Sequence, residues 1–492
     1  MKFQKSCFQD RTFKKSFFNS YILHALMSTN PTSSTYSSIY KDVLYLLVLL
    51  LSTVTFLYFI TFLSSLFFTI VLIKFFISKR DYLFFFYIFI LIQMPGGLFD
   101  EPYINMLSFT PKVGVSFIYF FILTAALKYW NRFQKIKFHY KEFNLVFLYF
   151  IFLFFVSFIY GYSARSILQY IYAIISLLFF IEIPIIINNR FILLRVIKLL
   201  FFSTILLFAF QLFDIIFSVK IIQLCIPSLS SDQLGASISI RNDEKIIRSI
   251  WCGWIAFFSL TISLYHLIKY KNRYFSYSYL YIVASVSFLH IFLSGTRGYI
   301  IQFIFILSIF FLLKSTKSVK IIALLCLFLI LFVKTFTPFQ QQLNFVNNRM
   351  QTLISLYEGD QTAEGTLIRL TERAPRVWNK YIESPVLGFG FSDEGCEYND
   401  GHVGNYVLLL QGGVVGFAIF FYTLLWFISR LLIQFFKNRN QQEIIILVSS
   451  IVSLVIAHST SSVVFNYYFE PSITSLFSFL IVFIKIEVFH NN

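Results

Sequence analysis

One histidine and a group of arginines are the side chains in this sequence best suited to chemistry. His402 stands just before a long apolar run, and an imidazole, whose ordinary pKa is near neutral, can accept a proton from a hydroxyl group. Three arginines precede it with helical spacing, namely Arg369, Arg373 and Arg376. Intervals of four and three residues place them on one helix face, where they repel one another unless an anion joins them. The pattern favours a phosphate or pyrophosphate site, unless nearby acids such as Glu364 and Glu372 neutralise the arginines.

A further arginine lies in a short turn between two apolar runs. The turn reads Ser294-Gly295-Thr296-Arg297-Gly298, and its glycines allow another group to approach the backbone closely. The Arg297 guanidinium can bind a pyrophosphate through two parallel hydrogen bonds. The structural alternative is an interfacial arginine that reaches lipid headgroups.

Three further signals accompany the arginines and the histidine. Pro375 is expected either in the first turn of a helix or at a kink. The segment Pro385–Gly390 contains two glycines and predicts a turn that returns the chain to the following apolar run. Gly412, Gly413 and Gly416 in that run indicate close helix packing rather than chemistry.

Composition places these residues in a membrane protein. Of the 492 residues, 58% are hydrophobic and 13% are charged, whereas soluble domains carry about 25% charged residues. Repeated apolar runs of about 20 residues predict an all-α polytopic membrane protein with about 12–14 transmembrane helices and one large outer loop. The net charge of +17 comes mostly from short loops, which argues against nucleic-acid binding.

The apolar runs define the expected membrane helices. After a long first run at 43–77, spans are expected near 82–99, 113–130, 143–160, 165–187, 193–218, 250–268, 277–293, 298–313, 319–336, 405–434, 443–465 and 472–489. The resulting regions are a polar basic tail at 1–42, membrane helices at 43–336, a polar loop at 337–404 and membrane helices at 405–492.

Charge predicts which loops share a side of the membrane. Six alternate loops are rich in Lys and Arg, near residues 74–80, 128–141, 190–198, 269–273, 314–320 and 430–439. Because cytoplasmic loops carry an excess of positive charge, these loops are expected inside. The loops containing Arg297, residues 219–249 and residues 337–404 are then all expected outside, where they can build one site.

The first apolar run leaves an alternative open. As a single helix, residues 43–77 would be about 50 Å long, too long for a hydrocarbon core of about 30 Å, and the basic N-terminus would lie outside. A two-helix hairpin would place that terminus inside. Met27 as the true start would remove most of the conflict.

The ordered set of motifs resembles the superfamily of bacterial O-antigen polymerases and ligases. The resemblance covers residues 290–420: SGTRG between spans, an outer loop with Arg, Trp and Pro-x-x-Gly-x-Gly, and His402 followed by Gly413 and Gly416. The ligase branch has a polar residue directly after the histidine, and Val403 departs from that pattern.

The resemblance implies a GT-C-like, metal-independent glycosyltransferase of the bacterial inner membrane with its active face in the periplasm. The implied donor is a glycan on undecaprenyl pyrophosphate, with Arg297, Arg369, Arg373 and Arg376 on the pyrophosphate and His402 on the acceptor hydroxyl. Arg297 is expected to be catalytic together with His402, no cofactor is expected, and a chain-length regulator protein is a possible partner. A repeat-unit polymerase is favoured, a ligase acting on lipid A-core or protein is the alternative, and a polysaccharide or lipid transporter is the alternative from another class.

Overall fold

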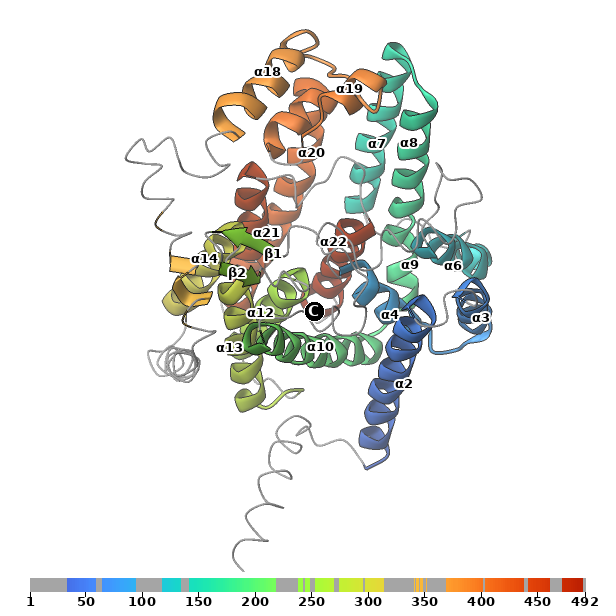
Figure 1. Cartoon of the computed structure of the whole chain (residues 1–492), viewed down its shortest axis with the longest axis vertical. Helices are drawn as coiled ribbons and strands as arrows, with labels where there is room; N and C mark the ends of the chain where they lie inside the picture. The colour runs from blue at the N-terminus through green and yellow to red at the C-terminus, as the bar shows by residue number, and fades with distance from the viewer. Residues whose placement is uncertain are drawn as a thin grey trace, which may run out of the picture.

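The computed structural model is predominantly helical (Figure 1). It describes residues 33–58, 64–93, 117–133, 141–217, 238–241, 244–247, 253–269, 274–294, 297–313, 340, 342–344, 346–347, 351, 369–400, 403–437, 441–460 and 471–489. The predicted span at 319–336 and the residues Glu364 and His402 lie outside these ranges.

The N-terminal half consists of helices that follow the predicted apolar runs. They are α2 (Ser33–Tyr58), α3 (Ser64–Ile77), α4 (Asp81–Gln93), α6 (Phe117–Phe133), α7 (Lys141–Tyr160), α8 (Ala164–Leu177), α9 (Phe179–Ile186) and α10 (Arg190–Phe217). The run at 165–187, expected as one span, is divided between α8 and α9, and Pro184 lies inside α9.

The C-terminal half adds further helices and two π-helical turns. They are α12 (Gly253–Ile268), α13 (Tyr277–Ser294), α14 (Arg297–Leu313), η3 (Arg369–Arg373), α18 (Ala374–Ile382), α19 (Asp393–Glu397), α20 (Gly404–Lys437), α21 (Glu443–Thr460), α22 (Pro471–Ile484) and η4 (Lys485–Phe489). An antiparallel hairpin of β1 (Ile238–Arg241) and β2 (Glu244–Ile247), paired from Ile238 with Ile247 to Arg241 with Glu244, departs from the all-α expectation.

Three of the described helices are long and apolar enough to cross a membrane: α10, α13 and α20. Shorter apolar helices accompany them, and α4 and α12 are buried along almost their whole length. A helix that is apolar on all sides is expected in the interior of a helical assembly. The chain therefore has the character of a membrane protein.

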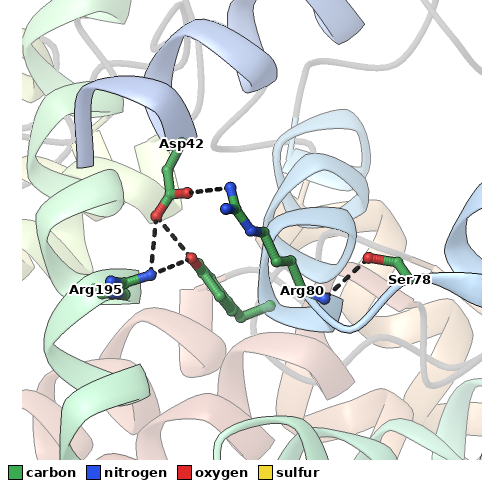
Figure 2. Close-up of polar contacts among 5 residues, drawn as sticks. Asp42, Ser78, Arg80 and Arg195 are labelled. Carbon is green, nitrogen blue, oxygen red and sulfur yellow. Dashed lines mark hydrogen bonds and ion pairs between the residues drawn. The ribbon is translucent and has the colours of Figure 1, made fainter. Parts of the chain in front are cut away.

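Contacts between loops divide the molecule into two ends. The basic end, defined here by the Lys- and Arg-rich loops, joins Asp42, Arg80 and Arg195 in one cluster (Figure 2). At the same end Arg190 and Lys269 share Glu487. These contacts bring together loops that charge alternation predicts on one side.

Two further contacts each join loops of the other class, and we call the part of the molecule that holds α18, α19 and the start of α20 the opposite end. Ser163, just after α7, donates its backbone N–H to Asp393 at 3.1 Å. Gln342 donates from Nε2 to the carbonyl of Leu293 at 2.7 Å, at the end of α13 that precedes Arg297. The pairing of loops predicted from charge is thus consistent with these contacts.

The first apolar run forms two helices rather than one. Asp42 of α2 contacts Arg80, three residues after the end of α3, with Nη1 and Oδ1 3.4 Å apart. The N-terminal part of α2 and the C-terminal end of α3 therefore lie together, which favours the hairpin over a single long helix. The helix α2 also begins ten residues earlier than the predicted span.

Candidate functional site

Two of the predicted arginines converge on one carboxylate at the opposite end. Arg373 Nη1 lies 3.6 Å from Asp400 Oδ1, and Arg376 Nη2 lies 3.7 Å from Asp400 Oδ2. The arginine side chains are 40% and 51% exposed, and that of Asp400 is 10% exposed. We call these three residues the arginine–Asp400 cluster. Its guanidinium groups are open to solvent and face one carboxylate at ion-pair distance.

Local helix geometry brings the two arginines together. Arg373 ends η3, and Arg376 lies in the first turn of α18, so the interval of three residues puts both on one side. Pro375 occupies the first turn of α18, where its missing N–H costs nothing, and the first of the two expectations for it is confirmed. Arg369 begins η3; its side chain lies outside the described residues.

The described partner of the arginines is Asp400, which was not predicted from the sequence. It is more than twenty residues away from both arginines in the chain, whereas the expected partners Glu364 and Glu372 are close to them, and Glu364 lies outside the described residues. Asp400 stands two residues before His402. The arginine cluster therefore lies beside the histidine segment.

The histidine segment connects the cluster to α20. The backbone N–H of Val403 donates to the carbonyl of Asp400 at 3.3 Å, and α20 begins at Gly404. His402 itself lies outside the described residues, so its predicted role stays a prediction. Arg297 begins α14, its side chain is likewise not described, and the described contacts do not join it to the cluster.

The turn at 385–390 does more than return the chain to α20. Phe389 and Gly390 donate their backbone N–H groups to the carbonyls of Leu410 and Gln411 at 2.8 and 2.7 Å. Val414 and Val415 of α20 donate in turn to the carbonyls of Pro385 and Val386, at 2.9 and 3.2 Å. The turn is thus hydrogen-bonded into a break in α20.

Glycines make this backbone pairing possible. Gly413 has φ +57° inside α20, and Gly388 has φ +69°, a region that side chains disfavour. A Cβ on Gly388 would meet the backbone of Gln411 at 2.5 Å. By contrast, Gly412 and Gly416 pack on side chains of α7, so the expectation of close helix packing is confirmed for these two and Gly413 has a different role.

The turn is also fixed to α7, which stands beside α20 in Figure 1. Phe391 donates its backbone N–H to the Ser157 hydroxyl, and Tyr160 donates to the Ser384 hydroxyl at 2.7 Å. The Ser384 hydroxyl donates to the carbonyl of Gly388 at 3.0 Å. Side-chain and backbone hydrogen bonds together fix the turn that follows α18 to α7 and α20.

Lys380 on α18 is committed to internal partners. Its Nζ contacts carboxylates of Glu383 and Glu394 at 2.6 and 2.5 Å and lies over the rings of Phe389 and Tyr398. Partial burial acts to lower the pKa of Lys380, but the hydrogen bonds to the two glutamates outweigh it and raise that pKa above its ordinary value. Lys380 therefore stabilises the fold, in contrast to the exposed Arg373 and Arg376.

Buried amides surround the same segment, and sequence reasoning missed them. The side-chain oxygens of Asn399 and Asn405 and the Nε2 group of Gln411 are buried and make no hydrogen bond. Buried polar groups are normally paired, so these three atoms are unsatisfied polar groups that the surrounding protein encloses. The only sequence signal was their position within nine residues of His402.

The arrangement presents two exposed cationic groups that can bind an anion. Among the described residues there is no group of three or more His, Cys, Asp or Glu side chains placed to hold a metal ion. No protein-family model, curated protein or solved structure matches the chain.

Proposed function

We propose that this protein is a glycosyltransferase that polymerises oligosaccharide repeat units carried on undecaprenyl pyrophosphate. In this proposal the opposite end faces the periplasm of a bacterial inner membrane, and the membrane domain is GT-C-like. The observation that carries the proposal is the convergence of Arg373 and Arg376 on a carboxylate two residues before His402.

The exposed guanidinium groups suit a pyrophosphate better than they suit Asp400. At 3.6 and 3.7 Å the two ion pairs with Asp400 are longer than good hydrogen bonds. A pyrophosphate offers several oxygens and can accept two parallel hydrogen bonds from each guanidinium. Donor binding would therefore exchange a loose internal pair for shorter contacts, with Arg297 and Arg369 as further ligands.

The proposed transfer step is a substitution at the anomeric carbon of the donor. The acceptor hydroxyl oxygen attacks the anomeric carbon of the donor, and the bond from that carbon to the pyrophosphate oxygen breaks. The bonding electrons leave with undecaprenyl pyrophosphate, whose developing charge Arg297, Arg369, Arg373 and Arg376 stabilise. His402 accepts the hydroxyl proton.

A genetic experiment tests the function. A strain deleted for the gene is complemented with the parent chain, His402→Ala, Arg297→Ala or the double variant Arg373→Ala/Arg376→Ala. We expect each variant to lower polymer output at least about 100-fold, because the loss of an electrostatic group that stabilises the transition state typically has that effect. Single repeat units should accumulate on the lipid, as measured by glycan electrophoresis and lipid extraction.

The matched control is Lys79→Ala, which removes an exposed cation from the basic end and should leave polymer unchanged. Full-length polymer that stays on undecaprenyl pyrophosphate would indicate the ligase instead. Repeat units that fail to reach the outer face would indicate the transporter. Normal surface glycan in the His402 and arginine variants would refute the catalytic assignment.

A further inference from the structure

The helix α18 divides its surface into three stripes. Ala374, Val377 and Tyr381 are buried against the protein. Pro375, Trp378 and Ile382 are exposed, and at 3.6 residues per turn they fall within about 60° of one another. A third stripe is polar and exposed, with Glu372, Arg376, Asn379 and Glu383. An exposed helix outside the apolar spans therefore presents an apolar flank beside a charged one.

The apolar flank continues into the turn that follows. Val386 is 59% exposed, and Leu387 beside it is also exposed. We call Pro375, Trp378, Ile382, Val386 and Leu387 the α18 apolar surface. Two leucine- or valine-sized side chains standing alone would need no explanation, but a contiguous apolar surface marks a site of interaction.

This surface is continuous with the exposed side of α20, a helix able to cross a membrane. Trp378 packs edge-on against Tyr406, with ring centroids 5.7 Å apart. The carbonyl of Val386 accepts the hydrogen bond from Val415, and the neighbouring Val414 is 55% exposed. Exposed apolar side chains on a membrane helix face lipid, and the α18 apolar surface extends the same face.

The depth of the turn agrees with a position at the edge of the hydrocarbon layer. Its partners Leu410 and Gln411 lie about 10 Å along α20 from Gly404, at 1.5 Å per residue. The kink at Gly413 ends this first part of α20, and the residues from Val414 to Lys437 span about 36 Å, enough to cross a core of about 30 Å. The turn pairs with α20 at the kink, and therefore at one end of that length.

We propose that the α18 apolar surface is embedded in the membrane interface, among the lipid acyl chains nearest the headgroups on the side of the opposite end. The polar stripe then faces water and headgroups, and Arg373 and Arg376 lie at the level of the lipid phosphates. The backbone of the turn tolerates this position because its N–H groups at Phe389, Gly390 and Phe391 are hydrogen-bonded to protein. This inference does not depend on the proposed function.

Quenching of tryptophan fluorescence tests the inference. The other four tryptophans, Trp130, Trp251, Trp254 and Trp426, are changed to Phe, and the full chain is reconstituted into phosphatidylcholine nanodiscs. The lipids carry bromine either near the headgroup or near the chain end. We expect about a twofold loss of Trp378 emission with bromine near the headgroup and a smaller loss with bromine near the chain end, because interfacial helices insert roughly 5–10 Å.

A second measurement is needed if the variant with four tryptophans changed to phenylalanine does not fold. The emission of the parent chain minus that of Trp378→Phe isolates the same residue with a single conservative change. Quenching by aqueous iodide but by neither brominated lipid would overturn the inference in favour of a water-exposed helix. Protection from iodide and from both lipids would overturn it in favour of cover by a second protein chain.

Discussion

The two ends of the molecule both place two cations on one carboxylate, but they do so in different ways. At the basic end Arg190 donates to both oxygens of Glu487, at 2.9 and 3.1 Å, and Lys269 lies 2.6 Å from Oε2. At the opposite end Arg373 and Arg376 stand 3.6 and 3.7 Å from Asp400. The carboxylate side chains are 0% exposed in Glu487 and 10% exposed in Asp400, and the cations are 34% and 17% exposed at the basic end against 40% and 51% at the opposite end.

These differences in distance and exposure indicate that the Glu487 cluster is structural, whereas the arginine–Asp400 cluster can exchange its carboxylate for another anion. Burial strengthens an ion pair but makes the loss of either partner costly, so the Glu487 cluster fixes α10 and α12 to the end of the chain. Asp42 is an intermediate case: it is buried and accepts a hydrogen bond from the Tyr82 hydroxyl at 2.6 Å, but its pairs with Arg80 and Arg195 (Figure 2) are 3.4 Å long and Arg80 is 56% exposed. Loose, exposed pairs contribute little to stability, which leaves Arg373 and Arg376 available to a ligand.

The largest expected effect on stability comes from neutralising Glu487, and the same change at Asp400 serves as its comparison. Glu487→Gln leaves Arg190 and Lys269 without their buried counter-charge and should cost about 3–5 kcal/mol of unfolding free energy. Asp400→Asn should cost about 0–1 kcal/mol, because its partners stay hydrated. Thermal unfolding of both variants in one detergent measures the difference. Equal losses would contradict the distinction between the two ends.

The sequence predicted the helices well and the contacts of the site only in part. Apolar runs mark helices wherever lipid or protein surrounds them, although only three of the described helices are long and apolar enough to cross a membrane. The contacts of Asp42 and Asp393 join segments that charge alternation predicts on the same side. Asp400 was missed as a partner because its pairing depends on a turn of the chain rather than on helical spacing.

The pairing of the 385–390 turn with α20 was also missed, for another reason. Its hydrogen bonds join backbone groups at Phe389, Gly390, Val414 and Val415, and backbone bonds leave little trace in side-chain patterns. The glycines that permit the pairing, Gly388 and Gly413, equally suit an ordinary turn and ordinary helix packing. Their positive φ values became visible only in the structure.

A pair of glycine variants tests how strongly this backbone pairing holds the opposite end. Gly161 and Gly388 both have positive φ, but a Cβ meets nothing within 4 Å at Gly161 and meets backbone at 2.5 Å at Gly388. Gly161→Ala should cost about 1–2 kcal/mol, the usual penalty for a left-handed conformation. Gly388→Ala should cost more and should reduce glycan output as well, because the turn and α18 must shift. Similar thermal unfolding of the two variants would show that the turn can move away from α20 at little cost.

The smallest expected effect on stability concerns the hydrogen bond between Asp393 of α19 and Ser163, which immediately precedes α8. The hydrogen bond from Ser163 holds the pKa of Asp393 below its ordinary value. A carboxyl group with a lowered folded pKa stabilises the fold above the unfolded pKa of about 3.9, and this stabilisation is lost as the pH falls through the folded pKa. Asp393→Asn should therefore lower stability at pH 7 by less than about 1 kcal/mol, since the group is exposed.

The expected loss of this stabilisation at low pH provides an internal control for the measurement. Unfolding midpoints of the parent and of Asp393→Asn should differ at neutral pH and converge as the pH is lowered below that of carboxyl titration. Glu397→Gln removes another exposed negative charge from α19 and should show a smaller difference at neutral pH. If the Asp393 difference persisted unchanged in acid, the asparagine would be acting through packing rather than through the lost charge. The contribution of Asp393 would then come from the shape and packing of its side chain rather than from its negative charge.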